Sequence, residues 1–173
     1  MTSHKQRHKA HLDQHVKDVN GEYQYIGDWY VLRGGKGRLY PFLAAVFAAG
    51  AFIIASGCIT ATGLKNTWYV IIPYIFEVSL LFALAWQAVR LACGQGRIKA
   101  FSFENTDPRI RPLCVGLALA ALLSAVCSGI FLLKAGPDGT AVACAGYFIL
   151  KALIASASLW AGRAYGVLEW VKQ

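Results

Sequence analysis

Four long apolar stretches dominate the chain, and polar or turn-forming residues bound each of them. A helix needs about 20 residues to cross the roughly 30 Å of hydrocarbon in a bilayer. Each stretch is long enough for one crossing, so the pattern predicts an all-α membrane protein with four transmembrane helices. The predicted spans run from Phe42 to Thr62, from Trp68 to Val89, from Leu113 to Leu133 and from Thr140 to Ala161.

The fourth stretch repeats features of the second. Glu77 in the second stretch corresponds to Lys151 in the fourth, 74 positions later. Trp86 corresponds in the same way to Trp160, also 74 positions later. This register predicts two duplicated helical hairpins. The expected organisation is an N-terminal basic and aromatic segment at 1–40, a first transmembrane hairpin at 41–92, a loop at 93–111, and a second hairpin with a short C-terminus at 112–173.

Small residues recur four positions apart in the first and third stretches. Ala44 and Ala48 follow this spacing in the first, and Gly116 and Ala120 follow it in the third. Small residues at this spacing let helix backbones approach closely in lipid. We therefore expect the first and third helices to be packing partners.

Composition and charge add a topology to this picture. Hydrophobic residues make up 57% of the chain and charged residues 15%, and the mean hydropathy is +0.46, values typical of membrane proteins. Lys and Arg are concentrated before residue 40, between 90 and 111, and after 162, whereas the short connections at 63–67 and 134–139 hold one each. By the positive-inside rule, both termini and the central loop are expected in the cytoplasm, with the protein in the plasma membrane.

The formal net charge of +8 is explained by this topology. Its expected partners are the lipid bilayer and anionic lipid headgroups, rather than nucleic acid. Residues 22–38 are aromatic and basic, and they fit either a small hairpin or a collar along the membrane interface. In the central loop, Gly94 and Gly96 predict the end of the second helix, and residues 104–107 predict turns before Pro108.

Glu77 and Lys151 are the charges inside the predicted spans. Glu77 lies eleven residues after Asn66 and thirteen before Arg90, and Lys151 lies twelve residues from both Gly139 and Arg163. At 1.5 Å per residue both charges are therefore near mid-membrane. One such charge costs about 2.5 to 3.5 kcal/mol on insertion scales. We therefore expect Glu77 and Lys151 to pair.

This charge pair has two interpretations. As a structural element it fixes the register of two helices. As a functional element Glu77 is a proton-linked carboxylate beside a polar cavity, because intramembrane ionisable residues are functional candidates. Pro73, one turn earlier, frees a backbone carbonyl and modestly favours a cavity. Candidate lining residues are Tyr74, Ser79, Tyr147 and Ser158.

The N-terminal segment contains every histidine of the chain. Their spacing of four, three and four residues places them on one stripe if the segment is helical. Neutral imidazoles one helical turn apart can share a divalent metal ion. The alternative is a basic tail without a metal. The candidate ligands are His4, His8, His11 and His15.

Two runs of residues resemble a known group of proteins. The run Gly27-Asp28-Trp29-Tyr30 precedes the first span, and the run from Tyr69 to Phe76, YVIIPYIF, opens the second. Together they resemble small four-span membrane proteins of Gram-positive bacteria that carry no assigned activity. The resemblance implies a four-span topology and supplies no mechanism.

Three functions remain after motifs are considered. The sequence contains no G-x-S-x-G, no H-E-x-x-H and no cluster of carboxylates, so an enzyme is not expected and no cofactor is expected. The first function is a non-enzymatic accessory or scaffold subunit, assembled with itself or with a larger membrane protein. The second is a small oligomeric proton-coupled transporter that uses Glu77 and Lys151. The third is a membrane anchor with a metal-binding histidine tail.

Overall fold

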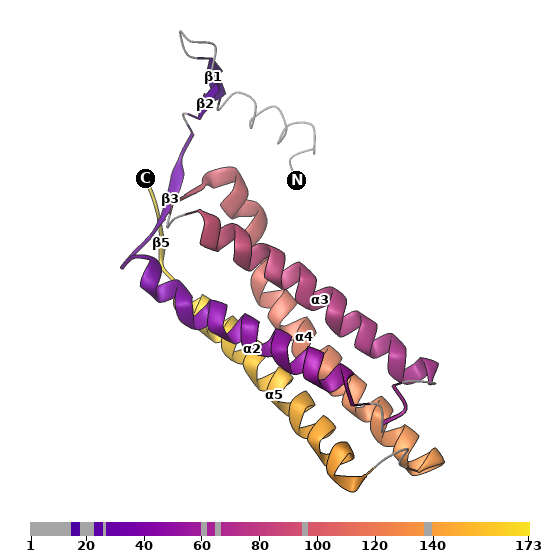
Figure 1. Ribbon diagram of the computed structural model, residues 1–173. Helices are drawn as coiled ribbons and strands as arrows, with labels where there is room; N and C mark the ends of the chain where they lie inside the picture. Colours follow the sequence, from indigo (N-terminus) through magenta and orange to yellow (C-terminus); the bar gives the residue numbers. More distant parts are fainter. Residues whose placement is uncertain are drawn as a thin grey trace.

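The protein is a bundle of four long helices with short strands at one end (Figure 1). The computed structural model describes residues 15–17, 23–25, 27–59, 62–64, 67–94, 97–136 and 140–173. Within these residues, all four helices are long and apolar enough to cross a membrane, which confirms the predicted all-α fold. They are α2 (Tyr40–Gly57), which the short 3-10 helix η1 (Lys36–Leu39) precedes, α3 (Trp68–Cys93), α4 (Ala100–Ala135) and α5 (Ala141–Gly166).

Local signals at the helix ends are readable in the sequence. Pro41 lies in the first turn of α2, where its missing N–H costs no helical hydrogen bond. The hydroxyl of Thr140 caps α5 by accepting a hydrogen bond from the N–H of Ala143 at 3.3 Å. Helix α4 ends at Ala135 and is followed by the C-cap residue Gly136, whose φ of 76° is readily adopted by glycine.

The four helices lie at the corners of a square and follow one another around it in chain order. Helix α5 packs extensively against α2 and α4, and α4 also packs against α3, whereas α2 and α3 share a thinner contact. Helices α3 and α5 therefore lie on one diagonal and α2 and α4 on the other (Figure 1). The expected pairing of the first and third helices is wrong, because the small residues Ala45 and Ala49 of α2 are buried in a bundle where α5 is the main neighbour of α2.

Helix α4 begins much earlier than the sequence indicated. The predicted turns at 104–107 are wrong, because the helix runs from Ala100 through Pro108 and Pro112. Its buried side chains continue at helical spacing across both prolines, and this continuous apolar stripe outweighs the two lost backbone hydrogen bonds. At 1.5 Å per residue the helix is about 54 Å long, so its first turns extend beyond a hydrocarbon layer of roughly 30 Å. The stripe includes Phe103, Ile110, Cys114 and Leu117.

A three-stranded sheet joins distant parts of the chain at one end of the bundle. Strand β3 (Trp29–Leu32) lies between β4 (Arg97–Lys99) and β5 (Trp170–Lys172), and both pairings are antiparallel. Tyr30 stacks on Phe103 of α4 at 4.3 Å between ring centroids, which fixes the sheet to the bundle. The segment before α2, the connection from α3 to α4 and the C-terminal residues therefore lie together at one end.

The remaining strands form a separate hairpin. Strand β1 (His15–Lys17) pairs antiparallel with β2 (Tyr23–Tyr25). The structure therefore places His15 in a strand, where it cannot continue a helical stripe of histidines. His4, His8 and His11 lie outside the described residues.

Candidate functional site

The two intramembrane charges meet at the centre of the bundle. Lys151 Nζ donates hydrogen bonds to both carboxylate oxygens of Glu77, at 2.9 Å to Oε1 and 2.7 Å to Oε2. The side chains are 1% and 0% exposed, respectively. The pair is therefore sealed from both lipid and water.

The pair connects two helices that are not neighbours. Glu77 lies on the buried face of α3 with Val70 and Leu84, and Lys151 lies on the buried face of α5 with Ile154. Because α3 and α5 occupy one diagonal of the bundle, the two side chains bridge its interior. The 74-residue register of the two hairpins thus places corresponding positions opposite each other, one acidic and one basic.

Two tyrosines enclose the ammonium group. Lys151 Nζ lies 5.1 Å from the ring centroid of Tyr74 and 5.0 Å from that of Tyr147. Both distances are within the range of cation–π attraction, which strengthens when the cation is removed from water. The rings therefore provide part of the stabilisation that the missing water would otherwise give.

Helix α2 holds Tyr74 in place. The Tyr74 hydroxyl donates a hydrogen bond to the backbone carbonyl of Ile53 at 3.3 Å. It also lies directly over Gly57, where an added Cβ would overlap the hydroxyl oxygen. Gly57 is thus required by the close approach of Tyr74 to the α2 backbone.

Helix α4 supplies two hydroxyls that sequence reasoning missed. Ser124 and Ser128 are fully buried, and each lies 3.1 Å from the Tyr147 hydroxyl. Ser124 also interacts with the Glu77 carboxylate. All four helices therefore contribute to the polar centre. The available signal was the spacing of these serines, which puts both on one face of a span.

Two of the predicted lining residues do not join this centre. Ser79 is exposed on the surface of α3 and donates to the carbonyl of Ile75 at 2.9 Å. Ser158 is buried, but it donates to the carbonyl of Ile154 in its own helix at 2.7 Å. Serines in apolar helices commonly make such bonds to the preceding turn. Of the four predicted residues, only Tyr74 and Tyr147 surround the ion pair.

Two hollows among the described residues lie away from the ion pair. Hollows of about 430 and 240 Å³ are found near the strands and the adjoining helix ends, and neither is lined by Glu77 or Lys151. Chemically, the polar centre is a closed ion pair with a hydroxyl shell. It can hold helices in register, and it can exchange a proton only if the bundle opens.

Comparison with protein-family models, with curated proteins and with solved structures finds no match to this chain. The resemblance to small four-span proteins of Gram-positive bacteria thus stays a prediction. The functional argument rests on the fold and on the chemistry of the polar centre.

Proposed function

We propose that this protein is a non-enzymatic scaffold or accessory subunit of a membrane assembly, in which the Glu77–Lys151 pair is a structural lock. The observation that carries the proposal is the complete burial of the pair, with both carboxylate oxygens bonded to the same ammonium group. A transport site must exchange its ligand with water. A sealed pair instead favours one helix arrangement, because any other register leaves a charge alone in a low-dielectric interior.

The outer surface of α3 supports an assembly role. Helix α3 packs less extensively against α2 than against α4, and it exposes a series of large apolar side chains. In the isolated chain this surface faces lipid, and it is also the surface that a second copy or a larger membrane subunit would cover. The exposed residues include Ile72, Ile75, Phe76, Phe82 and Trp86.

In the proposed topology the protein lies in the plasma membrane, and both of its termini are in the cytoplasm. The strands that join residues 29–32, 97–99 and 170–172 support a common side for the three segments. The excess of Lys and Arg in these segments favours the cytoplasmic side. Protease treatment of right-side-out vesicles tests this: a C-terminal tag should stay protected, and cleavage of the tag would reverse the topology.

The assembly proposal is tested by extracting the full-length protein gently from its own membranes and analysing retained partners by native mass spectrometry. We expect a stoichiometric complex with a larger membrane protein or with further copies of this chain. The charge-neutral double variant Glu77→Gln/Lys151→Met should retain that complex, since a lock is replaceable by neutral side chains of similar size. A monomeric wild-type protein without a partner would reject the scaffold role.

One observation favours a proton-coupled transporter as the second candidate. The buried hydroxyls of Ser128, Tyr147 and Ser124 form a hydrogen-bonded series that reaches the Glu77–Lys151 pair. Such a series can relay a proton. Proton flux into liposomes that contain the purified protein separates the two proposals: a transporter gives flux that Glu77→Gln/Lys151→Met abolishes, whereas a scaffold gives none with either protein.

A further inference from the structure

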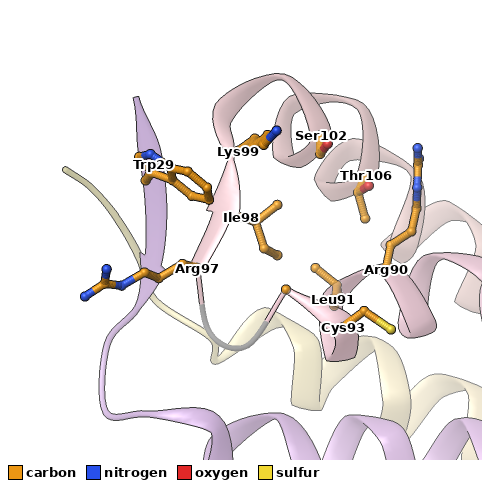
Figure 2. A pocket seen from close by; sticks show the side chains of 10 residues that line it. Trp29, Arg90, Leu91, Cys93, Arg97, Ile98, Lys99, Ser102 and Thr106 are labelled. Carbon is orange, nitrogen blue, oxygen red and sulfur yellow. The ribbon is translucent and has the colours of Figure 1, made fainter. Parts of the chain in front are cut away.

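A hollow far from the ion pair opens where α3 ends and α4 begins. Its volume is about 430 Å³, within the range of roughly 300 to 1,000 Å³ that is typical of small-molecule sites. Figure 2 shows Leu91 of α3 and Ile98 of β4 pointing into this hollow, with Ser102 and Thr106 of α4 on another wall. Its floor is thus apolar, with hydroxyl groups on one side.

The rim of this hollow is cationic. Arg90, Arg97 and Lys99 line it, and none of the lining residues that the structure describes is acidic. In Figure 2, Arg90 and Lys99 lie on the side of β4 that faces α4, whereas the Arg97 side chain extends in the opposite direction, past β3. An apolar floor inside a positively charged rim suits a ligand that combines a hydrocarbon part with a negative charge.

The depth of the hollow matches the lipid headgroup layer. Trp86 is 62% exposed on the surface of α3, and the Arg90 guanidinium lies 5.9 Å from its ring centroid. Exposed tryptophan is enriched where hydrocarbon meets headgroups. Arg90 follows Trp86 by four residues, about 6 Å along the helix axis, which places it among headgroup phosphates. The hollow begins at this level.

We propose that this hollow binds one anionic phospholipid. The phosphate lies at the rim beside Arg90 and Lys99, and the glycerol and the first part of the acyl chains lie against Leu91 and Ile98. Basic pockets between membrane helices are suited to such headgroups. The apolar floor and the position at the interface favour a lipid over a soluble phosphate. This proposal is independent of the scaffold role, because it concerns different residues at a different depth.

Native mass spectrometry of the full-length protein, released from nanodiscs of mixed phosphatidylglycerol and phosphatidylcholine, tests the proposal. We expect the wild type to retain one phosphatidylglycerol in preference to phosphatidylcholine. Arg90→Gln/Lys99→Gln should weaken this retention by roughly twenty- to thirtyfold, as expected for two cations near a headgroup. Ser102→Phe fills the hollow without changing charge, and it should also prevent retention.

The matched control is Arg111→Gln/Arg163→Gln. It removes the same charge from two exposed positions near the same end of the bundle that do not line the hollow. We expect retention to change by less than about threefold. Equal loss in this control would show diffuse attraction and overturn the site, as would equal retention of both lipids by the wild type. If Arg90→Gln/Lys99→Gln fails to fold, normal retention by Ser102→Phe still refutes the proposal.

Discussion

The ion pairs of this protein lie in two opposite environments. Glu77 and Lys151 are at most 1% exposed in the centre of the bundle. Arg33 and Glu169 form a second pair, which joins the strand region to the C-terminal residues. Arg33 Nη1 lies 3.2 Å from Glu169 Oε2, and the two side chains are 72% and 61% exposed. Water therefore cannot reach the buried pair, whereas it competes with each partner for the charges of the exposed pair.

This difference in exposure decides how much each pair contributes to the stability of the fold. In the interior, a charge that loses its partner has neither water nor a counterion, so the pair strongly disfavours other helix arrangements. At the surface, water and salt replace a lost partner, and the pair adds little. The exposed Lys172–Asp28 pair belongs to the second kind. The hydrogen bond to Asp28 raises the pKa of Lys172.

The largest effect is expected from breaking the buried pair on one side. Lys151→Met leaves Glu77 alone in the interior, and it should lower the free energy of unfolding by about 3 to 5 kcal/mol. Glu77→Gln/Lys151→Met should recover most of this loss. Unfolding by SDS in mixed micelles, followed by circular dichroism, measures both values. Lys134→Met, at an exposed position of α4, is the control and should be nearly neutral.

A smaller loss should follow when Tyr74 is displaced from its place beside the pair. In Gly57→Ala the new methyl group would overlap the Tyr74 hydroxyl. The expected loss is about 1 to 3 kcal/mol, typical of overpacking. Adding Tyr74→Phe should restore part of it, because the overlapping oxygen is removed. Gly129→Ala has open space around its methyl group and serves as control. An equal loss in both glycine variants would refute the packing argument.

Some features of this structure could be predicted from the sequence, and others could not. The spans and the two intramembrane charges are local signals, since a polar residue within an apolar run is evident without a fold. Ser124, Ser128 and Gly57 were missed because their roles depend on how each helix is rotated and on which helices are neighbours. The same limit explains the error over α2 and α4. Small residues identify a packing face, but they do not identify the helix that covers it.

The hydroxyl shell should matter less than the charges it surrounds. Ser124→Ala removes a bond to Tyr147 and a contact with Glu77. Hydrogen bonds between membrane helices average about 0.6 kcal/mol and reach about 1.7 kcal/mol, so the loss in unfolding free energy should fall in this range. Ser79→Ala, on the exposed face of α3, should change stability by less than about 0.5 kcal/mol. A larger effect at Ser79 than at Ser124 would contradict the assigned shell.

The smallest effect is expected at the surface pair, and salt distinguishes it from the buried one. Arg33→Gln/Glu169→Gln should cost at most about 1 kcal/mol, and less at high ionic strength, because exposed charges are screened. The backbone bond from the Arg33 N–H to the Glu169 carbonyl at 2.9 Å remains, and so does the contact between Phe103 and Trp170. Hydrogen exchange at β5 measures the change. The loss in Lys151→Met should persist in high salt, since ions cannot enter the sealed interior. Equal salt sensitivity of the two losses would mean that water reaches Glu77, and the transporter would then become the better explanation of the pair.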